Sequence, residues 1–137
     1  LKAYPNLTAD ILNKFKGYDG LVIEGTGLGH ISINETDKYT KENTKIFLTL
    51  KDLAKKTIIV MAPQTIYGRL QMDVYSTGRR LQEIGILGNF SDMTAETTYI
   101  KLAWLLSNYK KEDTKEMICK NLRGEISERI EDNTFLY

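Results

Sequence analysis

Short apolar runs alternate with amphipathic stretches along the 137 residues of the chain. Residues 20–24 and 57–62 are mostly apolar and rich in β-branched side chains, without alternation between apolar and polar positions. That pattern is typical of strands that are buried on both faces of a parallel sheet. Residues 1–4 have the composition of a further strand, which Pro5 ends. We therefore expect a small parallel sheet of about four strands, with residues 1–4 as a strand cut short by the start of the sequence.

Between the predicted strands, apolar residues recur at helical spacing. The pattern predicts helices over residues 7–15, 43–55, 74–84 and 112–122, and one more helix that begins after Thr94. Thr94 is a residue type that caps helix N-termini, and Glu96 stands in the first turn, where the helix dipole favours a carboxylate. In that helix we expect the buried face to consist of Tyr99, Leu102, Ala103, Trp104 and Leu106.

Strands separated by helices favour an α/β fold with three layers, in which helices cover both faces of the parallel sheet. Right-handed crossovers bring the carboxyl ends of parallel strands to one edge, so the loops after Glu24 and Ala62 are expected side by side. The chain fits one domain, residues 1–137, in which residues 124–137 form a tail of charged and apolar side chains. We expect residues 125–137 of this tail to be extended and to lie against a neighbouring molecule or against a surface that a missing domain would normally cover.

Composition narrows the possible functions. A net charge of +1 argues against a free-standing nucleic-acid binder, and no apolar run approaches the roughly 20 residues that a membrane span needs. Cys119 and His30 are the only residues of their kinds, which excludes an internal disulfide, a cysteine metal cage and a histidine-rich metal site. The sequence has no signal peptide, so we expect a cytoplasmic protein.

Two loops carry the candidate chemistry. Glycines at positions 25, 27 and 29 follow the first buried strand, and hydroxyl and aromatic side chains crowd residues 65–77 after the second. Open α/β sheets bind ligands at such strand ends. Dinucleotide-binding loops place the third glycine three residues after the second, which this loop does not, and a tight turn also explains the glycines. His30 is either a ligand contact or a polar residue at the edge of the loop.

Four segments carry a resemblance to a known family. Residues 21–30 (LVIEGTGLGH), 63–69 (PQTIYGR), 74–79 (VYSTGR) and 92–96 (DMTAE) are similar, in this order and spacing, to the C-terminal domain of the asparaginase/glutaminase family. The tail (GEISERIEDNTFL) resembles the ending of one branch of that family, the D subunits of archaeal glutamyl-tRNA(Gln) amidotransferases. Free asparaginases usually end near the last helix.

The resemblance implies that the catalytic residues lie elsewhere in a longer protein. The family's catalytic threonines belong to an N-terminal domain, within a Thr-Gly-Gly-Thr motif and a Thr-Asp motif. This chain has no Thr-Gly-Gly-Thr, and its single pair Thr36-Asp37 lies in a polar insertion, so we expect no catalytic residue in it. A threonine hydroxyl also needs a base and an oxyanion hole, which these loops do not offer.

In this family the C-terminal domain completes the active site of a neighbouring subunit in a close dimer. By motif match, the residues that bind the amino group of the substrate are Tyr75 and the nearby acid Asp73, with His30 or Thr26 close to them. A carboxylate and a phenolic oxygen are well suited to an ammonium group. The domain is thus expected to bind and orient the substrate.

The resemblance favours a glutaminase subunit that releases ammonia for a tRNA-dependent amidotransferase. Its expected partners are a second copy of itself in a homodimer, the E subunit of the amidotransferase, which uses ATP and Mg, and, indirectly, tRNA. No cofactor or metal is expected in this domain. Two alternatives remain, namely the C-terminal domain of a free type I L-asparaginase and a stand-alone α/β module that binds a small ligand or nucleotide.

Overall fold

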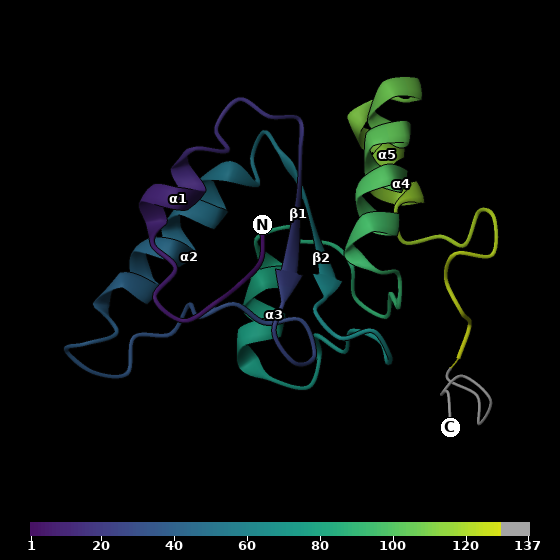
Figure 1. The fold of residues 1–137 in the computed structure, drawn as a ribbon. Coiled ribbons are helices and arrows are strands. Elements are labelled where there is room, and N and C mark those ends of the chain that lie inside the picture. The colour runs from purple at the N-terminus through teal and green to yellow at the C-terminus, as the bar shows by residue number, and fades with distance from the viewer. Residues whose placement is uncertain (130–137) are drawn as a thin grey trace.

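A two-stranded parallel sheet lies between two groups of helices (Figure 1). The computed structural model describes residues 1–129, so residues 130–137 of the predicted tail lie outside the described residues. The strands and helices are β1 (Gly20–Gly25), β2 (Ile58–Pro63), α1 (Ala9–Asn13), α2 (Lys41–Leu53), α3 (Ser76–Glu83), α4 (Ala95–Asn108) and α5 (Lys111–Met117). In Figure 1, α1, α2 and α3 lie on one side of the strands, and α4 and α5 lie on the other. The expected three-layer α/β fold is confirmed.

The sheet has fewer strands than expected. β1 pairs with β2 from Gly20↔Ile58 to Gly25↔Pro63, and each strand is flanked on its outer side by a single parallel bridge, Lys2↔Glu24 beside β1 and Val60↔Leu87 beside β2. The prediction of about four strands is wrong because the two outer segments pair too briefly. Pro5 lacks an N–H and closes the first segment, while glycines at 85 and 88, both with positive φ, bracket the second.

The parallel register places the ends of the two strands together. Glu24 is opposite Ala62, and the Gln64 N–H donates a 3.3 Å hydrogen bond to the Gly25 carbonyl just beyond the strands. The loops that follow β1 and β2 therefore leave the sheet at the same edge, as predicted.

Alternate residues of the strands face two separate cores, because successive side chains of a strand point to opposite faces. Leu21, Ile23, Ile59 and Met61 pack with residues of α1, α2 and α3. The intervening positions, Val22, Ile58, Val60 and Ala62, pack with residues of α4 and α5. Burial on both faces explains why the strands read as continuous apolar runs in the sequence.

The buried face of α4 differs from the one expected. Thr98, Lys101, Leu102 and Leu105 are buried, whereas Tyr99, Ala103 and Trp104 are exposed and Leu106 is half-buried. The helix is therefore rotated by about one residue from the predicted face, and of the predicted set only Leu102 is buried. The cap was predicted correctly, since the Thr94 hydroxyl accepts a 3.3 Å hydrogen bond from the Thr97 N–H.

The remaining helices keep their predicted places with shifted ends, and α5 is shorter than residues 112–122. After α5 the chain turns back along α4, where Lys101 and Glu125 form an ion pair. The expectation that the tail finds its contacts outside the domain is thus wrong for residues 125–129. No helix within residues 1–129 combines the length and the apolar character needed to cross a bilayer.

Candidate functional site

The loop after β1 is a tight turn that presents two of the predicted site residues together. Thr26 and His30 form an antiparallel bridge, with hydrogen bonds of 2.9 Å from each backbone N–H to the other residue's carbonyl. Gly29 has φ +102, and a Cβ on it would lie 3.0 Å from Cγ of Met72. The positive φ and the close approach together require glycine at this position.

His30 lies at the inner edge of this turn. Both ring nitrogens are buried and have no hydrogen-bond partner among residues 1–129. Burial lowers the pKa of His30, so its ring is neutral at pH 7. The ring meets Tyr75 edge to face, with 5.4 Å between the ring centroids. The ring therefore carries one donor and one acceptor that no residue uses, and because both are buried, the ring has to turn before a ligand can reach them.

The loop after β2, residues 64–75, is tied to the sheet and to the glycine turn. The Gln64 side-chain amide donates to the carbonyls of Ala3 and Glu24, at 2.6 and 2.9 Å. Further along, the Gln71 N–H donates to the Leu28 carbonyl at 3.0 Å. These contacts fix the two loops relative to each other at one edge of the sheet.

Tyr75 immediately precedes α3 and remains exposed, so its hydroxyl is accessible beside His30. The backbone just before it is held by Arg79, whose guanidinium donates to the carbonyls of Asp73 and Val74 at 2.6 and 3.1 Å. The Arg79 side chain therefore makes its hydrogen bonds to the backbone of this domain. Its contacts fix the direction in which Tyr75 leaves the loop.

The carboxylate of Asp73 faces different neighbours. Oδ1 accepts from the Gln82 side chain and Oδ2 accepts from the Asn89 side chain, each at 2.9 Å. These hydrogen bonds, that from Gln82 first, lower the pKa of Asp73. The structure thus brings Thr26, His30 and Tyr75 together, while Asp73 braces the loop against α3 and Asn89. Each carboxylate oxygen still has a second lone pair for a ligand.

Polar residues that the sequence pattern assigned to an insertion line a hollow of about 320 Å³ next to Thr26 and His30. The Asn34 side chain donates to the Thr77 hydroxyl at 3.1 Å and accepts from the Arg80 guanidinium, which stacks on the Phe47 ring at 4.3 Å. The other polar side chains of the hollow belong to Ser32, Thr36, Thr40 and Asn43. Asn34 and Arg80 were missed because they meet only in the folded chain.

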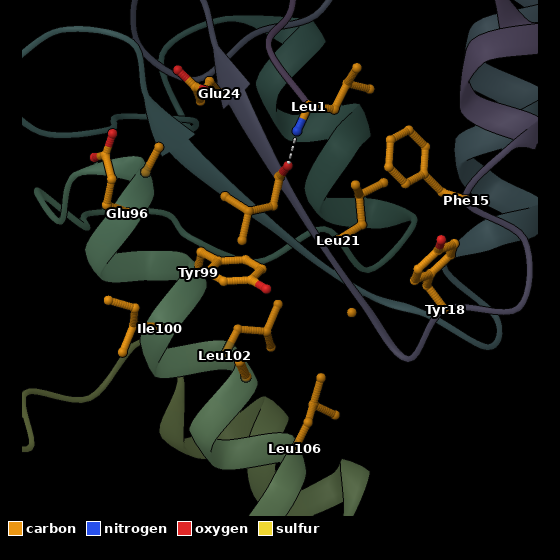
Figure 2. Close-up of a pocket in the computed structure, with 14 residues that line it drawn as sticks. Leu1, Phe15, Tyr18, Leu21, Glu24, Glu96, Tyr99, Ile100, Leu102 and Leu106 are labelled. Atoms are coloured by element: carbon orange, nitrogen blue, oxygen red, sulfur yellow. Dashed lines mark hydrogen bonds between the residues drawn. The ribbon is translucent and has the colours of Figure 1, made fainter.

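A larger hollow, about 820 Å³, is separate from these loops and mainly apolar. It lies between β1 and α4, where Tyr99, Leu102 and Leu106 of α4 are on one side and Leu21 and Tyr18 on the other (Figure 2). Within residues 1–129 there is no cluster of His, Cys, Asp and Glu side chains that would hold a metal ion. The polar loop edge therefore offers the hydrogen-bonding groups that the mainly apolar hollow lacks.

Three features of the structure are spread along most of the chain. They are the glycine turn after β1, the tyrosine before α3 and the helix cap at Thr94. Residues 1–118 match the family described as the glutaminase/asparaginase C-terminal domain. The chain belongs to the glutaminase/asparaginase family. Among its relatives in this family, the D subunit of the glutamyl-tRNA(Gln) amidotransferase of Methanococcus maripaludis is 40% identical over 134 residues, covering 95% of this chain and 29% of that protein.

Another relative in the glutaminase/asparaginase family extends the similarity through the C-terminal segment. The D subunit of the glutamyl-tRNA(Gln) amidotransferase of Pyrococcus horikoshii is 37% identical over 142 residues, covering 99% of this chain and 29% of that protein. Among solved structures, the thermostable L-asparaginase from Thermococcus kodakarensis superposes with a TM-score of 0.79 at 30% identity, covering 93% of this chain and 37% of that one. The chain spans less than a third of the length of the curated relatives it matches.

Proposed function

We propose that this chain is the C-terminal domain of a glutaminase, the D subunit of a glutamyl-tRNA(Gln) amidotransferase, and that it helps to form the amino-acid site of a neighbouring subunit. The observation that carries the proposal is the extent of the similarity. Relatives named as D subunits are 40% identical over 95% of the chain and 37% identical over 99% of it, against 30% for the L-asparaginase, which covers 93% of it. A free L-asparaginase is the second candidate, because the Thermococcus kodakarensis enzyme shares the fold at 30% identity.

The chemistry of the loop edge supports a role in binding. Tyr75 is exposed, His30 is neutral with both nitrogens unused, and Thr26 is exposed next to them. The phenolic oxygen of Tyr75 can accept a hydrogen bond from the amino group of a substrate, and Asp73 adds negative charge nearby. The reaction itself, release of ammonia from glutamine, is assigned to catalytic threonines in an N-terminal domain. The fragment alone is therefore expected to be inactive.

The proposed assembly includes a homodimer of the full-length protein and a partner, the E subunit of the amidotransferase, which uses ATP and Mg and receives the ammonia for tRNA-linked chemistry. Tyr99, Ile100 and Trp104 support an assembly of this kind, since they are large apolar residues exposed on one helix, beside the apolar hollow. The domain itself is proposed to bind no cofactor.

The experiment measures ammonia release by the full-length protein, with and without its partner, from glutamine and from asparagine. In this protein Tyr75→Phe should raise KM for glutamine and lower kcat/KM by about 10- to 100-fold, because a hydrogen bond to a charged group contributes about 1.5–3 kcal/mol. Tyr109→Phe, an exposed tyrosine that contacts Trp104, is the matched control and should behave as wild type.

Three results would count against the proposal. Wild-type kinetics for Tyr75→Phe in the intact dimer would remove the assigned binding role. Turnover of asparagine in preference to glutamine, unaffected by the amidotransferase partner, would favour the free asparaginase. Activity of the isolated chain in clean preparations would contradict the assignment of the catalytic residues to another domain.

A further inference from the structure

The segment after α5 folds into a compact turn against α4, although it contains no helix or strand within residues 118–129. The Asn121 side chain accepts a 2.7 Å hydrogen bond from the Gly124 N–H, and Gly124 has φ +89. The Glu125 carboxylate accepts from the backbone N–H groups of Leu122 and Arg123, the latter at 2.6 Å. We call residues 121–129 the C-terminal brace.

Glu125 fastens the brace to α4. Its Oε1 lies 2.6 Å from Nζ of Lys101, and the two side chains are only 15% and 7% exposed. The Lys101 ammonium also donates to the Lys120 carbonyl. Burial raises the pKa of Glu125, but the hydrogen bonds from Lys101 and from the backbone N–H groups outweigh it and bring the pKa to about 2. The Glu125 carboxylate therefore stays ionised at neutral pH, opposite the Lys101 ammonium.

Arg69 joins the brace to the loop after β2. Its guanidinium donates to two consecutive carbonyls of the brace, Ser127 at 2.9 Å and Glu128 at 3.1 Å. The Ser127 N–H in turn donates to Asp92 at 3.1 Å. The planar guanidinium can hold two acceptors in one fixed orientation, which a single ammonium group does not. Arg69 therefore connects this end of the loop to the brace at two points.

Arg69 is followed directly by the residues that connect the two loops of the candidate site. Leu70 is fully buried and its N–H donates to the Ser91 carbonyl at 2.9 Å. Gln71 is the residue that binds the Leu28 carbonyl of the glycine turn. By contrast, Ile66 is 80% exposed in the preceding part of the loop. The brace thus binds the loop at Arg69, between its exposed part and the buried residues that follow.

We propose that the C-terminal brace positions the loop after β2, with Arg69 as the positioning residue, so that binding of the amino-acid substrate depends on residues 121–129. The inference rests on the proposed function, because it assigns the brace to the same site. The similarity to the D subunit of Pyrococcus horikoshii, which covers 99% of the chain, includes the brace.

The test compares variants of the full-length protein in its complex, by ammonia release from L-glutamine and by hydrogen exchange of backbone amides. Arg69→Gln should speed exchange within residues 64–72 about tenfold and raise KM about tenfold, with kcat within about twofold of wild type. Arg69→Lys should give exchange rates and a KM between those of wild type and Arg69→Gln. Its ammonium keeps the positive charge but lacks the planar fork that holds both carbonyls in a fixed orientation. Truncation before residue 121 should raise KM at least as much as Arg69→Gln, and because it also removes Glu125, the partner of Lys101, it should lower the stability of the whole fold.

Two variants serve as controls. Lys111→Met removes a comparable tie at the opposite edge of the sheet, where Lys111 binds Asp19 at 2.7 Å and the Lys56 carbonyl at 2.8 Å. A chain ending at Arg129 keeps every contact of the brace described above. Both should leave exchange within residues 64–72 and KM for glutamine unchanged.

Unchanged exchange within residues 64–72 in Arg69→Gln would overturn the inference. Faster exchange in Arg69→Gln that spreads equally over β1 would also overturn it, because Arg69 would then stabilise the whole fold and not this loop in particular. A wild-type complex that releases no ammonia from glutamine would overturn the proposed function alone, and the exchange comparison would still decide whether the brace positions the loop.

Discussion

Replacing Glu125 with glutamine should change how stability depends on pH. The folded protein lowers the pKa of this carboxyl from 4.5 to about 2. One pKa unit corresponds to about 1.4 kcal/mol, so we expect the ionised carboxylate to stabilise the fold by roughly 3 kcal/mol. Little of this is lost to solvent screening, since the side chains of Glu125 and Lys101 are 15% and 7% exposed. In Glu125→Gln the charge is gone and Lys101 stays buried without its partner.

The sign of this pH dependence follows from the direction of the pKa shift. A depressed carboxyl pKa contributes stability that is fully present above the unfolded pKa, near 4.5, and is lost as the pH falls toward the folded pKa, near 2. The free energy of unfolding of wild type should therefore exceed that of Glu125→Gln by about 3 kcal/mol at pH 7, and the difference should fall to less than about half of that at pH 3.

Urea titrations of the two proteins between pH 7 and pH 3 measure this difference directly. Glu116→Gln, which removes an exposed carboxylate from α5, is the matched control and should follow wild type. A difference between wild type and Glu125→Gln that is constant over the whole range would refute the reasoning, because it would mean that the charge of Glu125 contributes nothing.

Four further substitutions test the packing and a helix cap. Trp104→Ala should cost less than about 1.5 kcal/mol, because the side chain is 50% exposed, whereas Leu102→Ala should cost about 2–5 kcal/mol; equal losses in urea titrations would contradict the observed face of α4. Gly78→Ala should destabilise by about 1–3 kcal/mol, since its Cβ would lie 2.2 Å from the Met72 carbonyl oxygen, and an unchanged Tm would show that α3 moves away freely. Thr94→Ala should cost about 1 kcal/mol in the same titration through loss of the helix cap, and a cost near zero would argue against the cap.

The strands and the edge at which their loops meet were predictable because the information is local. A continuous apolar run records burial on both faces, and a parallel sheet with helical crossovers then dictates that successive loops leave at one edge. The number of strands was not predictable in this way. The residues near Lys2 and Leu87 form single bridges because each segment runs only briefly beside the neighbouring strand. The positions of proline and glycine set the length of that pairing.

The buried face of α4 was mispredicted for a specific reason. Residues 98, 101, 102 and 105 have the same helical spacing as 99, 102, 103 and 106, so periodicity alone allows both faces. The true face contains Thr98 and Lys101, whose polar groups argued against burial. Thr98 is satisfied by the carbonyl of Thr94, four residues before it. Lys101 is satisfied by Glu125, and nothing near it in the sequence indicates that partner.

The candidate site was likewise predictable only where its contacts are indicated by nearby sequence. Thr26, His30 and Tyr75 follow two strand ends, so their meeting could be inferred from topology, and the motif match named them. Arg69 ends one of the matched segments, but nothing in the sequence indicated its role, since it binds two backbone carbonyls more than fifty residues away. A guanidinium that binds backbone carbonyls leaves no pattern in the side chains of its partners. The side chains of residues 127 and 128 can thus change without loss of the two hydrogen bonds from Arg69, provided that the backbone there takes the same path. That path is fixed by the Asn121 and Glu125 turn and by Lys101, so side chains at these positions, rather than at the carbonyls themselves, should determine whether the brace holds the loop.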